Sequence, residues 1–183
     1  MPSLCPGWDV HDVLAHLVDT AKTTRLGFLR GLAAARGDFD RHNDDGIARE
    51  RAATPAATLA ELRRICDATN TPPVPLATRL VEAIVHGEDI RRPLGLARTY
   101  PDEPQQAALR HQLATGVSVG GGRERAAGFR LRASDSGLAH GSGPEVMASG
   151  LALLMSVSGR PADGDEFSVP GAATFVRRLG RVS

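Results

Sequence analysis

Residues 5–18 read CPGWDVHDVLAHLV and contain the clearest helix start in the chain. Asp9 is a helix-capping residue type, and Asp12, three residues later, stands where a capping box places its second side chain. Apolar residues then recur at the three- and four-residue spacing of an amphipathic helix: Val10, Val13, Leu14, Leu17 and Val18. The pattern predicts one helix that continues to about Ala35 and ends before Gly37.

Three more helical stretches follow in the front part of the chain. They are expected over residues 44–69, 76–91 and 103–117. Thr54-Pro55 is an N-cap and first-turn pair, so the first of these stretches can break there. The proline-rich segment 70–75 is not helical in character and is expected to be a stiff connection. The front of the chain is therefore expected to be all-helical.

The glycine cluster at residues 120–122 marks the predicted domain boundary, because the sequence pattern changes beyond it. The elements expected there are a β-hairpin and two helices: strands over residues 129–133 and 138–142, and helices over residues 144–157 and 171–181. We therefore predict a mainly α protein, with a helical domain over residues 1–119 and a small α+β domain over residues 120–183.

Composition and charge exclude several classes of protein. The 22 basic and 21 acidic residues leave a net charge of +1, so the chain lacks the basic field that generic nucleic-acid binding uses. No apolar run approaches the roughly 18–20 residues of a membrane span, and the N-terminus lacks the basic and apolar regions of a signal peptide. Cys5 and Cys66 form no CxxC pair, which fits a reduced cytosolic protein. We expect a soluble, cytoplasmic protein that binds neither nucleic acid nor a membrane.

The helix expected over residues 76–91 carries the most informative polar spacing. Glu82, His86 and Asp89 are four and then three residues apart, so they fall on one stripe of a helix. A carboxylate and an imidazole one turn apart can hold one divalent cation, although the same spacing also fits a solvated polar face. His16 lies at the edge of the first apolar stripe, where a half-buried structural histidine is the alternative interpretation. As a third ligand it would complete a His2Glu set with an open position.

These residues also carry a resemblance to a known family. Residues 5–17, CPGWDVHDVLAHL, resemble the opening motif of the mycothiol-dependent maleylpyruvate isomerase family, which belongs to the DinB-like metal-binding superfamily. Residues 85–95, VHGEDIRRPLG, resemble its second hallmark, an HGxDxRRPLG-type segment that closes the metal-binding helix. Residues 39–44 are similar to its connection between helices, and residues 131–135 and 141–146 to its small C-terminal domain.

The resemblance implies a fold and a set of site residues. The fold is a DinB-like four-helix bundle, whose first helix is missing here, followed by a small α+β C-terminal domain. The resemblance implies that His16, Glu82 and His86 bind zinc or another divalent metal, with Asp89 orienting a ligand from behind. It also implies that Arg160 is a catalytic contact for substrate carboxylates. The alternative for Arg160 is a surface side chain that favours the helix dipole.

The implied function follows from the chemistry of a metal-bound thiol. A free thiol is mostly protonated at neutral pH, whereas a thiol bound to zinc is deprotonated. The resemblance therefore implies an enzyme, an isomerase or S-transferase that activates mycothiol as a thiolate toward a small electrophilic substrate. The alternatives are a non-catalytic metal-binding module with a regulatory or partner-binding role, and a carrier of small apolar ligands in the back domain. Neither Cys5 nor Cys66 is needed as the nucleophile, and both are expected to be packing residues.

Two features differ from the family pattern. Family members usually carry a helix of about 20–30 residues before the opening motif, which here begins almost at Met1. Because a bundle without that helix would expose an apolar face, we expect either a truncated sequence or a partner chain that covers the face. The second difference is at residues 138–140, Leu-Ala-His, where the family has a tryptophan-containing stretch. The substrate and the oligomeric state stay open.

Overall fold

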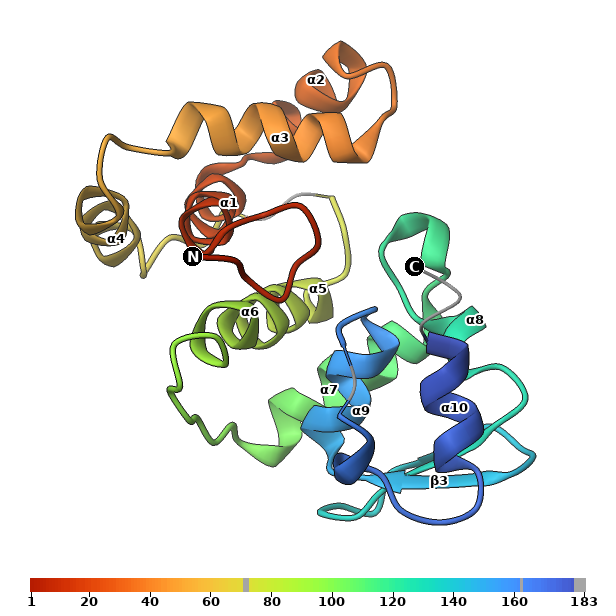
Figure 1. Cartoon of the computed structure of the whole chain (residues 1–183). Helices are drawn as coiled ribbons and strands as arrows, with labels where there is room; N and C mark the ends of the chain where they lie inside the picture. The colour runs from red at the N-terminus through yellow and green to blue at the C-terminus, as the bar shows by residue number, and fades with distance from the viewer. Residues whose placement is uncertain (71–72, 162, 180–183) are drawn as a thin grey trace. The chain divides into compact units, whose positions relative to one another are not determined.

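The computed structural model describes residues 1–70, 73–161 and 163–179. By their internal contacts the residues form two compact units, Met1–Ala97 and Arg98–Ser183. The protein is mainly helical and has a small three-stranded sheet in its second unit (Figure 1). In the described part of the chain, no helix combines the length and the apolar character that a membrane span requires.

The first unit is built from helices around α1. Its elements are α1 (Val10–Lys22), α2 (Arg25–Ala34), α3 (Phe39–Glu50), α4 (Pro55–Arg64), α5 (Ala77–Val81), the π-helical turn η1 (Glu82–His86) and α6 (Gly87–Arg91). The backbone stays right-handed helical from α5 through η1 to α6, so these three elements form one continuous helix. This composite helix and the helices α3 and α4 all contact α1, which therefore lies in the middle of the unit (Figure 1).

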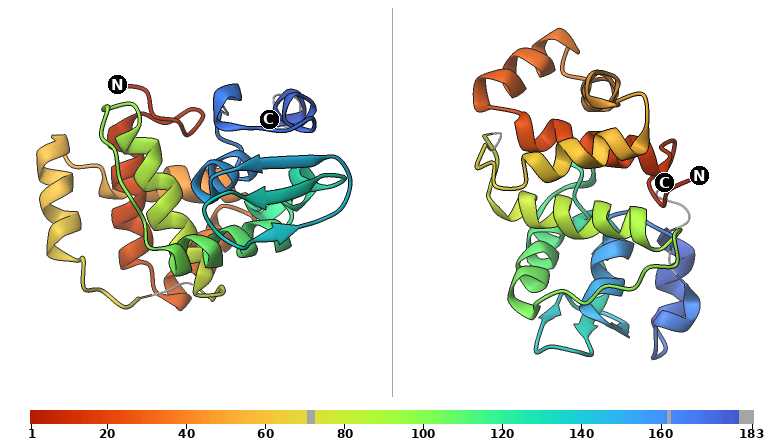
Figure 2. Two further views of the ribbon diagram at one scale, coloured as in Figure 1. Left: turned by 90° about the horizontal axis from the view of Figure 1, so that it is seen from below. Right: turned by 90° about the vertical axis from the view of Figure 1, so that its left-hand side faces the viewer.

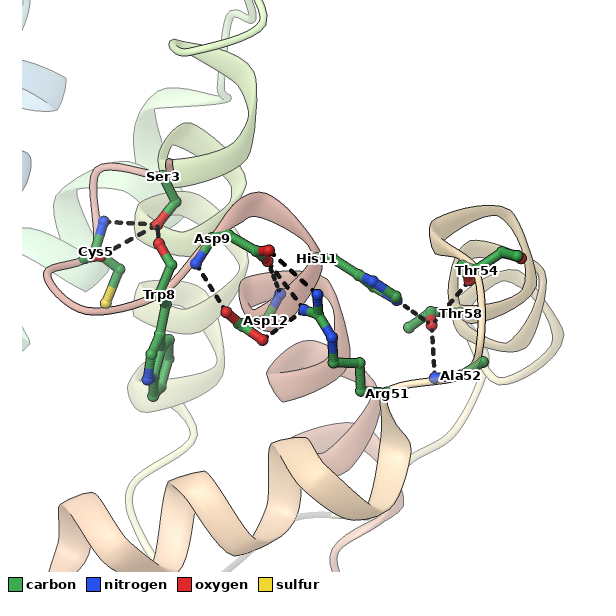
Figure 3. A network of polar contacts seen from close by, with 10 residues as sticks. All are labelled: Ser3, Cys5, Trp8, Asp9, His11, Asp12, Arg51, Ala52, Thr54 and Thr58. Atoms are coloured by element: carbon green, nitrogen blue, oxygen red, sulfur yellow. Dashed lines mark hydrogen bonds and ion pairs between the residues drawn. The ribbon is translucent and has the colours of Figure 1, made fainter. Parts of the chain in front are cut away.

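The start of α1 is fixed by the capping box that the sequence predicts. The Asp12 N–H donates to Asp9 Oδ1 at 2.8 Å, and the Asp9 N–H donates to Asp12 Oδ2 at 2.9 Å. The Arg51 guanidinium, which follows α3, forms ion pairs with both carboxylates at 3.0 and 2.5 Å (Figure 3). The same two side chains therefore begin α1 and tie it to the end of α3.

The end of α1 differs from the prediction. One helix to about Ala35 was expected, but α1 ends at Lys22 and α2 starts anew at Arg25. The Thr23 hydroxyl donates to the Asp19 carbonyl at 2.8 Å, and Thr24 Oγ1 accepts the Gly27 N–H at 3.1 Å. The two threonine side chains therefore bond to backbone groups at the end of α1 and at the start of α2, which lets α1 end and α2 begin within two residues.

The remaining helices of the first unit follow the predicted order, but α3 begins at Phe39, so residues 39–44 are helical rather than the expected connection. Thr54 caps α4 and Pro55 is its first residue, so the break expected at this pair is confirmed. The composite helix covers Ala77 to Arg91, as predicted, whereas Cys66 is exposed rather than packed in the core. That prediction is wrong because α4 ends at Arg64, before the cysteine. Two residues of the proline-rich connection, 71 and 72, lie outside the described residues.

The second unit combines helices with a sheet. Its elements are α7 (Asp102–Ala114), η2 (Val117–Val119), α8 (Arg123–Ala126), β1 (Arg130–Ala133), β2 (Ala139–His140), β3 (Glu145–Ala148), α9 (Gly150–Val157), η3 (Gly164–Glu166) and α10 (Ala172–Leu179). The strand order is β2-β1-β3 (Figure 2). Leu131 of β1 pairs with His140 in the antiparallel hairpin and with Val146 in the parallel pair. The predicted hairpin is therefore confirmed, and β3 is an additional strand.

The helix predicted from Pro144 to Val157 is only partly correct. Residues 145–148 form β3, and α9 begins at Gly150 after its N-cap Ser149. The Asp135 carboxylate accepts the Gly150 N–H at 2.9 and 3.0 Å, so the turn after β1 helps to fix the start of α9. A short apolar run fits a buried strand as well as a buried helix, and pairing with β1 decides for the strand.

The core of the second unit lies between α9, α7 and a cluster of phenylalanines. The Phe175 ring is fully buried and lies 5.2 Å from Phe129 and 5.8 Å from Phe167 between ring centroids. Helix α7 packs on α9 and so belongs to this unit by its contacts. The domain boundary at residues 119/120 stays a prediction. Of the tail helix expected to Arg181, α10 is described to Leu179, and Arg181 lies outside the described residues.

Candidate metal centre

The three residues predicted as metal ligands lie together in the first unit. His16 comes from α1, and Glu82 and His86 come from η1. His16 Nε2 lies 3.2 Å from Glu82 Oε2, and His86 Nε2 lies 3.8 Å from the same oxygen. Each residue offers a ligand atom within 4.8 Å of the other two. The group has the two imidazoles and one carboxylate of an open zinc site.

The turn that carries Glu82 and His86 is a π-helical turn rather than the α-helical turn that the sequence predicts. Such turns are rare, occur mostly as single insertions within α-helices, and are frequent at functional sites. Ile84 and Val85, between the two polar residues, are buried at 3% and 2% exposure. The widened turn therefore packs its apolar residues in the core while both polar side chains reach His16 of α1.

The charge of the Glu82 carboxylate is set by its neighbours. Burial raises its pKa, but the close imidazole of His16, followed by the charges of His86 and Arg79, lowers it to about 2. Arg79 is held in place because its guanidinium donates to the Thr20 carbonyl at 3.0 Å. Glu82 is therefore anionic at neutral pH, the form that a metal ligand requires.

Two buried atoms of this group lack hydrogen-bond partners within the described part of the chain, Glu82 Oε2 and His16 Nδ1. Glu82 Oε2 is within ion-pair distance of His16, but the geometry does not form a hydrogen bond. Buried polar atoms without partners cost free energy, and native proteins rarely leave them so. A cation held between Glu82 and the imidazoles would satisfy the carboxylate oxygen, so the residues present fit a divalent metal.

Asp89 lies behind His86, on the side away from Glu82. The His86 Nδ1 atom is 2.9 Å from Asp89 Oδ2, and Asp89 is fully buried. Because a carboxylate accepts only, this contact places the ring proton on Nδ1 and leaves the Nε2 lone pair toward Glu82. Carboxylates behind ligating histidines fix the ring in this way in many metal sites.

Trp8 lies against the two imidazoles and was not predicted as a site residue. Its ring centroid is 4.9 Å from that of His16 and 6.1 Å from that of His86. The indole Nε1 atom donates to Asp44 Oδ1 at 3.3 Å, which holds the ring across the start of α1. Its place in the CPGW motif, next to the cap Asp9, was the available signal. Trp8 is the single tryptophan of the chain, so it is also a natural fluorescent probe of the centre.

The loop before α1 brings Cys5 to the same region. The Ser3 hydroxyl donates to the Trp8 carbonyl at 2.7 Å and accepts the Cys5 N–H at 3.0 Å (Figure 3). The Leu4 N–H donates to the Asp89 carbonyl at 3.3 Å, which joins the loop to α6. Cys5 is half-buried there, and a ligand atom of Cys5 lies within 4.8 Å of ligand atoms of His86 and Asp89. Cys5 was expected to be a packing residue, and its nearness to His86 and Asp89 was not predicted.

Arg160, the predicted substrate contact, lies in the second unit just after α9. Its Nη1 atom donates to the Ser158 carbonyl at 2.8 Å. Burial and the nearby charge of Arg160 both lower the pKa of Arg125, so two guanidinium groups lie near each other at this end of α9. The role of Arg160 toward the metal centre stays a prediction.

Comparison with known families supports the interpretation of the first unit. The family described as the mycothiol maleylpyruvate isomerase N-terminal domain matches residues 1–72. The match covers less than half of the chain, and over these residues the chain is similar to that family. The match includes the loop with Cys5 and Trp8 and the helix with His16, while Glu82 and His86 lie beyond it. No curated protein and no solved structure matches the chain.

Proposed function

We propose that the protein is a metal-dependent thiol enzyme whose centre is formed by His16, Glu82 and His86. The observation that carries the proposal is the meeting of these side chains around Glu82 Oε2, which has no hydrogen-bond partner, in a unit whose first part matches the mycothiol maleylpyruvate isomerase N-terminal domain. A divalent ion held there, zinc in this proposal, would supply the positive charge that keeps a bound thiol deprotonated. The thiol would be mycothiol or a related low-molecular-weight thiol.

The residues of the first unit prepare the centre for this task. Asp89 holds the proton on His86 Nδ1, so the ring presents Nε2 toward Glu82. Trp8 lies against both imidazoles and would limit the access of water to a bound ion. In the proposal α1, α3, α4 and the composite helix form a DinB-like bundle, with α1 as the shared neighbour of the others. A cytoplasmic location would keep the thiol reduced.

The substrate in this proposal is a small electrophile that the thiolate attacks at carbon. Addition and later release of the thiol gives isomerisation, and retention of the new carbon–sulfur bond gives S-transfer. Arg160 would bind a substrate carboxylate. The nearness of Arg125 supports this role, because an anion would relieve the repulsion between two guanidinium groups. The fold alone does not choose the substrate within this class.

Metal analysis of the full chain tests the centre directly. The protein is stripped with a chelator, incubated with zinc, desalted and analysed for bound metal. We expect one zinc per chain in the wild type and in His140→Ala, an exposed histidine in the second unit that serves as the matched control. His16→Ala and His86→Ala should each retain little zinc. Full occupancy in both variants would overturn the proposed centre.

A second measurement separates an enzyme from a non-catalytic module. In the cobalt-loaded protein, mycothiol should change the visible spectrum, because a thiol that enters the open position changes the ligand field. Arg160→Gln should then lower kcat/KM for thiol addition to a carboxylate-bearing electrophile while metal content stays the same. Arg110→Gln, on the exposed face of α7, is the matched control. Bound metal with no response to mycothiol would favour the module.

A further inference from the structure

A second group of metal-ligating side chains lies on the other side of His86. It consists of Cys5, His86 and Asp89, whose ligand atoms all lie within 4.8 Å of one another. We propose that this group is a second metal site, which prefers softer thiophilic ions such as Cd²⁺ to zinc because of its thiolate donor, and that it competes with the first site through the shared His86. The site itself does not depend on the proposed enzyme function; only the competition does.

The spacing of the donors suits one small ion. Zinc-type ions bind sulfur at about 2.3 Å and imidazole nitrogen or carboxylate oxygen at about 2.0–2.2 Å, so donors of one tetrahedral site lie about 3.5 Å apart. His86 Nδ1 and Asp89 Oδ2 are 2.9 Å apart, and the Cys5 thiol is within 4.8 Å of its two partners. A small movement of these side chains is enough to place one ion between them.

The backbone positions Cys5 before any ion binds. The Leu4 N–H donates to the carbonyl of Asp89, so the residue before the cysteine is bonded to the residue that carries the carboxylate. Ser3 fixes the next peptide, because its hydroxyl accepts the Cys5 N–H and donates to the Trp8 carbonyl (Figure 3). The loop can return through its tight turn because Gly7 has φ +81°. The three donors therefore come from two segments that are already joined.

The donor set defines the class of ion. A thiolate, an imidazole and a carboxylate suit thiophilic borderline and soft ions, whereas Mg²⁺ and Ca²⁺ prefer oxygen ligands alone. Asp89 is fully buried and Cys5 is half-buried, so the cysteine side is the route by which an ion reaches the site. Binding forms a metal–sulfur bond and releases the Cys5 thiol proton to solvent, with no oxidation or reduction.

His86 makes the two sites exclusive. A neutral imidazole carries one proton and one free lone pair, so it binds a metal through Nε2 or through Nδ1, but not both. With the proton on Nδ1, the Nε2 lone pair is available to the site with His16 and Glu82. When an ion takes Nδ1 beside Cys5 and Asp89, the proton moves to Nε2 and the first site loses this ligand. A thiophilic ion would therefore displace zinc without competing for His16 or Glu82.

Cadmium titration of the full chain, stripped of metal, tests the site by the ultraviolet charge-transfer band of a cadmium–thiolate bond. We expect the band in the wild type and in Cys66→Ser, which removes the exposed second thiol and is the matched control. His16→Ala should keep the band because His16 belongs to the first site alone. Cys5→Ser should lose it, and Asp89→Asn should weaken cadmium binding at least about tenfold.

A measurement on the wild-type protein guards against variants that do not fold. Cd²⁺ should protect Cys5 from alkylation by iodoacetamide, as read by mass spectrometry of the Cys5 peptide, and Mg²⁺ should not. The proposal is overturned if the band persists in Cys5→Ser, if it requires Cys66, or if Cys5 reacts equally with and without Cd²⁺. If zinc binding is lost in His16→Ala but the wild type shows no cadmium–thiolate band, this proposal alone is contradicted. If the wild type shows the band but His16→Ala still binds zinc as the wild type does, the proposed function alone is contradicted.

Discussion

The two units of the chain bury different kinds of side chain. Around α1, the first unit buries a polar set: His11, His16, Asp19, His42, Thr58, Glu88 and Asp89. The second unit buries fewer polar side chains, which are uncharged amides and hydroxyls: Gln105, Gln112, Ser156 and Ser158. Its fully buried large side chains are apolar: Leu109, Leu131, Val146, Leu153, Leu154, Met155, Val157 and Phe175. Burial of polar groups costs free energy unless they are paired, whereas apolar burial stabilises directly. The comparison indicates that buried ionisable groups are concentrated in the first unit, as the proposed metal centre requires, and that the second unit is built on a hydrophobic core.

The largest expected effect is on the stability of the second unit. Phe175→Ala removes a fully buried ring that contacts Phe129 and Phe167, and we expect it to lower the free energy of unfolding by about 3–5 kcal/mol. Urea unfolding followed by circular dichroism measures this change. Val119→Ala, at an exposed residue of the same unit, should stay within about 0.5 kcal/mol of the wild type. Zinc binding by Phe175→Ala should equal that of the wild type. A loss of zinc in this variant would show that the metal centre of the first unit depends on the core of the second unit.

The next effect belongs to the first unit and depends on metal. If the polar set around His16 is a binding site, zinc at 100 times its dissociation constant should stabilise this unit by about 2.7 kcal/mol. Thermal unfolding with and without zinc measures the gain, and Trp8 fluorescence reports it from the first unit alone. The gain should vanish in His16→Ala and persist in Phe175→Ala. A gain of equal size in His16→Ala would assign the metal to other residues.

The sequence predicts the parts of the first unit that depend on near neighbours. The capping box of Asp9 and Asp12 spans four residues, and the pair Thr54-Pro55 spans two, so each can be predicted from local chemistry. The positions of Glu82 and His86 follow from helical spacing in the same way. Their meeting with His16 was implied only by the resemblance, because it depends on how α1 packs against the composite helix.

Three features could not be predicted because they depend on distant contacts. The π-helical turn inserts no unusual residue, and it is stabilised by packing of Ile84 and Val85 in the core. Strand β3 depends on pairing with β1, since an apolar run alone fits a helix as well. The nearness of Cys5 to Asp89 depends on one backbone hydrogen bond across more than eighty residues of sequence. Features set by neighbouring residues are therefore more predictable here than features that depend on contacts between distant segments.

A smaller effect tests how the polar set of the first unit is held together. Asp9→Ala removes the N-cap of α1 and should cost about 1 kcal/mol of unfolding free energy. The Arg51 guanidinium, opposed in part by burial, holds the pKa of the Asp9 carboxyl well below its usual range. The contribution of the charged Asp9 carboxylate to stability is therefore complete above about pH 4, the usual pKa of aspartate, and falls as the pH decreases below it. Asp9→Asn keeps a capping side chain, but its free energy of unfolding should depend less on pH below pH 4 than that of the wild type. Urea unfolding between pH 2 and pH 6 measures this dependence.

The smallest effect concerns His11, which is buried beside α4. Its Nε2 atom lies 2.8 Å from the Thr58 hydroxyl, and Thr58 also accepts the Ala52 N–H (Figure 3). Burial, followed by the charge of Arg51, lowers the pKa of His11, so the folded protein prefers the neutral ring. The stability that this neutral ring contributes is complete above pH 6.5, the pKa in the unfolded chain, and is lost as the pH falls through the lower pKa of the folded protein.

His11→Gln keeps a hydrogen-bonding side chain without a titrating group, so its free energy of unfolding should change less than that of the wild type between pH 7 and pH 5. His140→Ala, at an exposed histidine of the second unit, should retain the wild-type dependence. An unchanged slope in His11→Gln would show that burial of this ring does not contribute to the acid sensitivity of the first unit.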